Sequence, residues 1–117
     1  MNVIIFSGRL ADTPKLETHG ETKLARFRLI RNEYAGKNED GSRKERQVSV
    51  PFTAFRHLAE LLAKNALVGD QVTVRGAIRN NNYTTGEGAD RYDYNFDVEE
   101  IEFGAPGHEK RKRLASA

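Results

Sequence analysis

The chain has 117 residues, of which 31% are charged and 38% hydrophobic, and its formal net charge is +2. This length corresponds to one domain, and the absence of cysteine excludes disulfides, thiolate zinc sites and thiol nucleophiles. No apolar run approaches the roughly 18 residues of a membrane span, and the first ten residues lack the pattern of a signal peptide. We therefore expect a soluble cytoplasmic protein.

The charge is unevenly distributed. Residues 108–117 hold four basic and one acidic residue, so residues 1–107 have a net charge of −1. Within that body, residues 1–46 have a net charge of +3 and residues 47–107 a net charge of −4. A polyanionic partner would therefore bind local clusters of basic residues and not an overall positive field.

The first half of the chain predicts three strands. Residues 2–10 are β-rich, with Gly8 indicating a bend, and residues 14–23 are predicted to be a polar loop. Residues 24–33 alternate, which places Ala25, Phe27 and Leu29 on one face and Arg26 and Arg28 on the other. Residues 34–45 are predicted to be a long charged loop, and residues 47–55 the third strand, with Pro51 indicating an edge or a bulge.

The second half predicts one helix and two strands. The helix covers residues 56–67 and ends before Gly69. Residues 71–80 form a strand, residues 80–91 a hairpin-like excursion, and residues 92–103 the last strand, with a phase slip after Val98 that predicts a bulge. The predicted inward residues of these two strands are Val72, Val74, Ile78, Tyr92, Tyr94, Phe96, Val98, Ile101 and Phe103.

This order of elements predicts the OB-fold, an all-β five-stranded Greek-key barrel with one helix between strands three and four. The barrel covers residues 1–103, and residues 104–117 are expected to be a disordered basic tail.

Basic and aromatic residues recur on the outward face and in the loops. Single-stranded nucleic acid binds to this combination, because cations follow the phosphates and flat rings stack on the bases. The candidate ligands of the phosphates are Arg26, Arg28, Arg75 and Arg79, and the candidate stacking residues are Tyr34, Phe55 and Tyr83. The alternative for each arginine is a solvated strand face, and for Phe55 a place in the core.

Catalysis and metal binding find little support. Asp93, Asn95, Asp97 and Glu99 recur at every second position, but the interleaved residues are apolar or aromatic, so a solvated acidic face is favoured over a metal site. The three histidines lie apart from each other and have no nucleophile beside them. We expect no enzyme activity, no cofactor and no metal.

Several segments together resemble one family. These are Ser7-Gly8-Arg9-Leu10, Ala25-Arg26-Phe27-Arg28-Leu29, Phe55-Arg56-His57-Leu58, the stretch 68–79, Tyr83 and Asp90-Arg91-Tyr92. In order and spacing they resemble the bacterial single-stranded DNA-binding proteins, over residues 1–103. PriB-like primosomal proteins are a related alternative, and a protein-interaction OB-fold module is another.

The resemblance implies sequence-independent binding and protection of single-stranded DNA in replication, recombination, repair or plasmid transfer, with RNA left open as a ligand. Phe55 matches a base-stacking phenylalanine, Tyr83 the position of a stacking tryptophan, Arg79 a backbone-contacting arginine, and Tyr34 lies within a residue of another stacking position. A third such position falls at Ser49, which cannot stack. The resemblance also implies a nucleoid-associated bacterial protein and a homo-oligomer, with a tetramer favoured over a dimer.

The C-terminal residues depart from the family pattern. The family typically ends in an acidic tip that recruits replication and recombination proteins, whereas this chain ends in a short basic segment. We therefore expect a tail-less variant without recruitment through a tip. Its basic residues Lys110, Arg111, Lys112 and Arg113 are predicted to add phosphate contacts.

Overall fold

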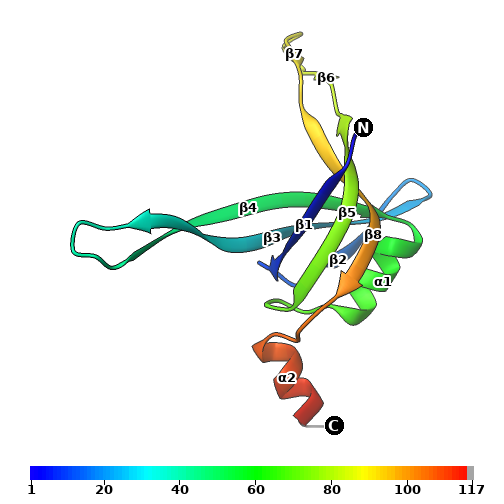
Figure 1. Cartoon of the computed structure of the whole chain (residues 1–117). Coiled ribbons are helices and arrows are strands. Elements are labelled where there is room, and N and C mark those ends of the chain that lie inside the picture. The colour runs from blue at the N-terminus through cyan, green and yellow to red at the C-terminus, as the bar shows by residue number, and fades with distance from the viewer. Residues whose placement is uncertain (116–117) are drawn as a thin grey trace.

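Five strands close into a ring in the computed structural model, which describes residues 1–115. They are β1 (Ile4–Leu10), β3 (Thr22–Lys37), β4 (Arg43–Phe55), β5 (Gln71–Asn80) and β8 (Tyr94–Phe103). The sheet order is β1-β5-β8-β4-β3, and β1 also pairs with β3, which closes the barrel (Figure 1). The predicted OB-fold is confirmed, and β5 has the bounds that the sequence predicts.

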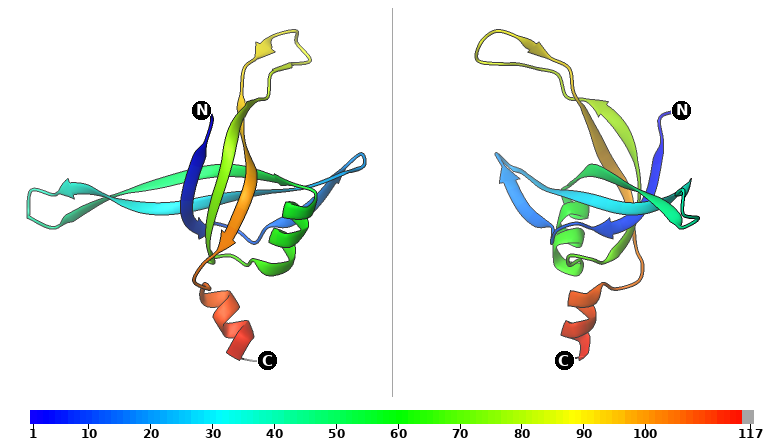
Figure 2. Two further views of the ribbon diagram at one scale, coloured as in Figure 1. Left: turned by 45° about the vertical axis from the view of Figure 1, so that its right-hand side comes forward. Right: turned by 90° about the vertical axis from the view of Figure 1, so that its left-hand side faces the viewer.

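The remaining elements surround this barrel. They are β2 (Lys15–His19), α1 (His57–Asn65), the short hairpin of β6 (Tyr83–Thr84) with β7 (Asp90–Arg91), and α2 (His108–Ala115). Figure 2 shows the β3–β4 hairpin and the β6–β7 hairpin projecting from the barrel in different directions. The helix α1 lies between β4 and β5 in the chain, as predicted.

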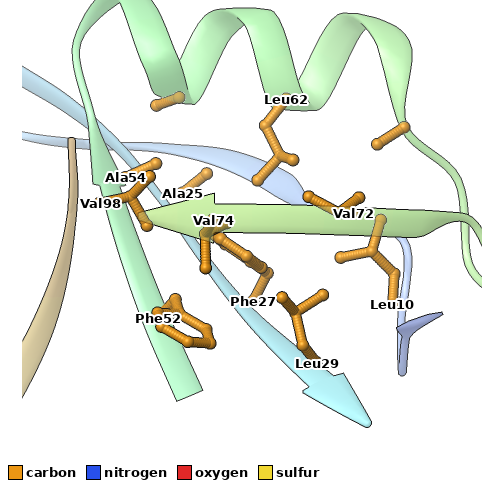
Figure 3. Close-up of a cluster of buried hydrophobic side chains, with 12 residues drawn as sticks. Leu10, Ala25, Phe27, Leu29, Phe52, Ala54, Leu62, Val72, Val74 and Val98 are labelled. Carbon is orange, nitrogen blue, oxygen red and sulfur yellow. The ribbon is translucent and has the colours of Figure 1, made fainter. Parts of the chain in front are cut away.

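The core follows the alternation of the strands. Ala25, Phe27 and Leu29 of β3 are buried, and Phe27 stacks on Phe52 of the neighbouring strand with ring centres 5.7 Å apart. Leu62 of α1 points toward the buried side chains of the barrel (Figure 3). Burial of large apolar side chains is the main stabilising contribution in a domain of this size. Because Leu62 belongs to the barrel core, α1 covers one end of the barrel.

Glycines permit two close approaches between strands. A Cβ atom on Gly8 would lie 2.7 Å from the carbonyl oxygen of Ile30, at the point where β1 meets β3. A Cβ atom on Gly76 would collide with the carbonyl oxygen of Asp97 on β8. Gly76 adjoins the register shift between β5 and β8, where Arg75 pairs with Glu100 and Gly76 with Val98. The bulge predicted in the last strand is thus confirmed.

Two segments predicted as loops form strands instead. Residues 34–37 and 43–45 extend the β3–β4 hairpin, which turns at residues 38–42, and β2 forms within the predicted loop 14–23. The physical reason is that strand pairing satisfies backbone hydrogen bonds without any burial of side chains. Polar residues on both faces are therefore compatible with a hairpin that projects into solvent.

The inward assignments fail at the ends of two strands. Ile78, Tyr92, Tyr94 and Phe103 were predicted to point inward, but all four are exposed. Phe103 ends β8 on the side of α2, where Nζ of Lys110 lies 5.9 Å from the centre of its ring. Ile78, Tyr92 and Tyr94 lie at the opposite end, where β5 and the chain before β8 continue beyond the barrel toward the β6–β7 hairpin and no second layer covers them (Figure 1). Alternation there identifies a face of the strand, but the face has no core beneath it.

The C-terminal segment also differs from the expectation of disorder. Residues 108–115 form α2, and the preceding residues pair with the barrel: the backbone N–H of Gln71 donates to the carbonyl of Ala105, and that of Gly104 donates to the carbonyl of Gln71. Backbone pairing of this kind needs no apolar pattern, which is why the sequence did not indicate it.

Candidate nucleic-acid interface

A groove of about 620 Å³ lies over β3 and β4 and reaches the start of β8. Its floor contains Phe27 and Phe52, whose stacked rings belong to the core, and Pro51 lies beside them. Because β3 and β4 are paired along this length, the floor is a rigid two-stranded surface.

The groove brings together three of the predicted site residues: Arg26, Arg28 and Phe55. Arg26 stands opposite Thr53, and Phe55 ends β4 opposite Leu24. Arg28 donates a hydrogen bond of 2.9 Å from Nη1 to Oγ of Ser49, which orients its guanidinium along the strand. Two cations thus stand on the same face of β3, two residues apart, with an aromatic ring nearby.

Arg75 and Arg79 do not line this groove. Arg75 forms ion pairs with Glu100, at 3.0 Å, and with Glu99, at 3.4 Å, and Arg79 lies 3.7 Å from Glu99. These carboxylates belong to β8, the neighbour of β5, and Glu99 is the extra residue of the bulge. Part of the positive charge of both arginines is therefore already neutralised within the protein.

The predicted stacking tyrosines lie on the two projecting hairpins. Tyr34 is 58% exposed on the extended part of β3, and the guanidinium carbon of Arg43 lies 5.3 Å from the centre of its ring. Tyr83 lies on β6 with its backbone opposite Arg91, and its side chain lies outside the described part of the structure. Tyr34 does not line the groove over β3 and β4.

The structure adds a residue that the sequence analysis assigned to the core. Tyr94 is 60% exposed and lines the groove, together with Phe96, Asn81 and Asn95. The backbone N–H of Tyr94 donates to Oδ1 of Asp93 at 2.8 Å, and the N–H of Asn81 donates to the carbonyl of Asp93. The sequence signal for Tyr94 is its position just after a polar hairpin, which is comparable to the position of Tyr34 at the edge of a polar segment.

Asp97 of β8 has a partly buried carboxyl group next to the bulge. Its Oδ1 is buried and has no hydrogen-bond partner within residues 1–115. Burial raises the pKa of this carboxyl, while the positive charge of Arg79 opposes the rise. Asp97 also pairs through its backbone with Thr53 of β4, which runs parallel to β8.

Metal-binding clusters and membrane-spanning helices are both absent from residues 1–115. Within residues 1–115 no three His, Asp or Glu side chains are grouped so that they could hold a metal ion. No helix in the same range is long and apolar enough to span a membrane.

Comparison with known proteins identifies a family and a relative. Residues 1–104 match the Single-strand binding protein family. A single-stranded DNA-binding protein of Clostridium perfringens (strain 13 / Type A) is 30% identical over 105 residues. That alignment covers 88% of this chain and 65% of the relative, so the chain spans about two-thirds of the relative's length.

Proposed function

The chain belongs to the single-strand binding protein family, and from this premise we propose that it binds single-stranded DNA without sequence preference. The observation that carries the proposal is the groove over β3 and β4, where Arg26 and Arg28 stand beside Phe55 and Tyr94. Cations that neutralise phosphates and rings that stack on bases are the two requirements of sequence-independent binding.

In the proposed mechanism the groove holds the strand and the hairpins extend its path. Phe55 and Tyr94 stack on bases within the groove, and Arg26 and Arg28 neutralise the adjacent phosphates. Tyr34 and Tyr83 supply further stacking surfaces on the β3–β4 and β6–β7 hairpins. Every base has a π-face, so this arrangement accepts any sequence.

Arg75 and Arg79 have a secondary part in this mechanism. Each must exchange its contact with Glu99 or Glu100 for a phosphate, and such an exchange returns less free energy than neutralisation by an unpaired arginine. Catalysis has no part in the proposal.

We further propose a homo-oligomer, with a tetramer favoured over a dimer. From Ile4 to Gly8, β1 pairs with β5 on one side, whereas its pairing with β3 involves only Arg9 and Leu10. Ile5 is 68% exposed on this strand. An open strand edge with an apolar side chain favours pairing with another copy of the chain.

The proposed setting is bacterial replication, recombination, repair or plasmid transfer, in contact with nucleoid DNA in the cytoplasm. Proteins of those processes are proposed as partners. RNA stays an alternative ligand, because stacking alone does not distinguish ribose from deoxyribose.

The test is fluorescence anisotropy of a dye-labelled oligo-dT strand titrated with the whole chain at low and high salt, with duplex DNA and the matching RNA as competitors. We expect binding to oligo-dT that duplex DNA does not displace and that weakens with salt. Equal competition by RNA would widen the ligand class. Absence of binding at low salt would refute the proposal and favour a protein-interaction module.

A further inference from the structure

A second groove, also of about 620 Å³, lies between α2 and the barrel. Its lining includes Lys112 and Arg113 of α2, Leu67 and Val68 after α1, and Thr13. Thr13 also lines the groove over β3 and β4, so this residue borders both grooves. The Oγ1 of Thr13 accepts a hydrogen bond of 3.0 Å from the backbone N–H of Val68, which fixes the junction.

The basic face of α2 is turned toward this groove by its helical spacing. Glu109, Lys112 and Arg113 are three and four residues apart and line the groove together, whereas Arg111 does not. Glu109 lies in the first turn, where the helix dipole favours an acid, and the two cations lie in the last turn. The end of the groove formed by the last turn is therefore positive.

A buried carboxylate holds α2 in this position. Asp70 is 2% exposed, and its Oδ1 accepts the backbone N–H of Gly107 over 2.7 Å. Lys110 lies 3.4 Å from the same carboxylate and donates to the carbonyl of Asn65 over 2.6 Å. Lys110 is thus engaged in holding the helix, and the groove receives its charge from the next turn.

We propose that α2 continues the path of single-stranded DNA beyond the barrel, with the strand passing over Thr13 and its phosphates contacting Arg113. This inference rests on the proposed function and specifies a further binding surface for it. A strand that leaves the first groove at Thr13 lies next to the lining of the second groove. The cations of that lining are complementary in charge to a phosphate backbone, and each phosphate that they neutralise releases a counterion.

The chain offers a matched pair of variants. Arg113→Ala and Arg111→Ala remove the same charge from the same helix, but only Arg113 lines the groove. Each is titrated with dye-labelled oligo-dT of about 8 and about 20 nucleotides, the shorter lying within one barrel's site size. We expect Arg113→Ala to lower the salt slope for the long strand by about 0.7 and to weaken its binding several-fold. Binding of the short strand should be unchanged for both variants.

A third variant tests the position of the helix without any change of charge. A Cβ atom on Gly107 would lie 2.6 Å from the carbonyl oxygen of Gly69 and 2.8 Å from the backbone nitrogen of Asp70, so Gly107→Ala must displace the start of α2. We expect it to weaken long-strand binding as Arg113→Ala does. The short-strand affinity and the melting temperature report whether the barrel itself remains folded.

The outcomes separate the two proposals. If the wild-type chain bound neither the short nor the long strand, the proposed function would be overturned, and this inference with it. Normal wild-type binding with equal effects of Arg113→Ala and Arg111→Ala, or with no effect of either, would overturn the inference alone. Should Gly107→Ala fail to fold, the arginine pair still decides.

Discussion

Gly107 donates its backbone N–H to the buried Oδ1 of Asp70, and the backbone N–H of Leu67 donates to the other oxygen of the same carboxylate over 3.0 Å. One side chain thus joins the segment after α1, the start of β5 and the start of α2. A buried carboxylate is tolerated here because donors satisfy both of its oxygens.

Asp70→Asn should destabilise the chain. An amide nitrogen in place of one carboxylate oxygen leaves the N–H of Gly107 or of Leu67 without an acceptor, and Lys110 loses its ion-pair partner. We expect a loss of about 1–3 kcal/mol, measured by urea unfolding. Asp12→Asn, at an exposed position, is the control and should change little. Equal stability of the two variants would contradict the assignment.

The same carboxylate predicts a pH dependence of stability. Burial alone would raise the pKa of Asp70, but hydrogen bonds from Gly107 and Leu67 and the charge of Lys110 outweigh it, so the pKa lies below its usual 3.8. The unfolded chain therefore takes up this proton first as the pH falls. The stability contribution of Asp70 should be complete above about pH 5 and decline below it. The difference in free energy of unfolding between the wild-type chain and Asp70→Asn, measured from pH 7 down to pH 3, should therefore become smaller as the pH falls.

Asp97 should have the opposite effect. Burial raises the pKa of this carboxyl against the attraction of Arg79, and its buried Oδ1 has no partner within residues 1–115. The folded state holds the proton more tightly than the unfolded state, so stability is lost as the pH rises through the raised pKa. We expect Asp97→Asn to stabilise the chain by about 1 kcal/mol at pH 7 and to lose that advantage at low pH. Thermal unfolding at both pH values measures the effect, and a destabilised variant at pH 7 would refute it.

Tyr94 and Tyr92 form a natural comparison for the stacking role. Both are exposed, Tyr92 at 76%, but only Tyr94 lines the groove over β3 and β4. Tyr94→Ala should weaken binding of oligo-dT by about 1–3 kcal/mol, because one base loses its stacking surface, and Tyr92→Ala should have little effect. Anisotropy titrations of both variants decide the matter. Similar losses from the two would mean that the groove is not the base-binding surface.

The arginines should differ in the same assay repeated over a range of salt. Arg26→Ala should lower the magnitude of the salt slope by about 0.7, the value for one phosphate contact on a single strand. Arg75→Ala should lower it less, because Glu99 and Glu100 already neutralise part of that charge. If Arg75→Ala had the larger effect, the strand would follow β5 instead of β3.

Ile5 tests the proposed assembly. Ile5→Lys places a charge on the open strand β1, which discourages pairing between edges, and it should reduce the mass measured by sedimentation equilibrium. Leu114→Lys, on α2, is the control, because this leucine is also exposed and apolar but lies on no strand edge, and it should leave that mass unchanged. Unchanged masses for both variants would show that β1 is not the contact between copies.

The local sequence pattern was sufficient to predict burial and secondary structure wherever the neighbours of a residue lie along its own strand or helix. The alternation of residues 24–33 predicted which face of β3 is buried, and the phase slip after Val98 predicted the bulge at Glu99. The helix between β4 and β5 followed from its apolar stripe. These features arise from the side-chain period of two residues in strands and 3.6 residues in helices, which can be read from the spacing of apolar residues in the sequence.

Only the tertiary structure decided which outward residues share a surface. Arg26 and Arg75 look alike in sequence, but β3 pairs with β4 to form the groove, whereas β5 pairs with β8 and brings Glu99 and Glu100 against Arg75. Tyr94 and the docking of α2 on Asp70 depend in the same way on segments distant in the chain. Register and strand order are set by the closure of the whole barrel, and no single segment contains that information.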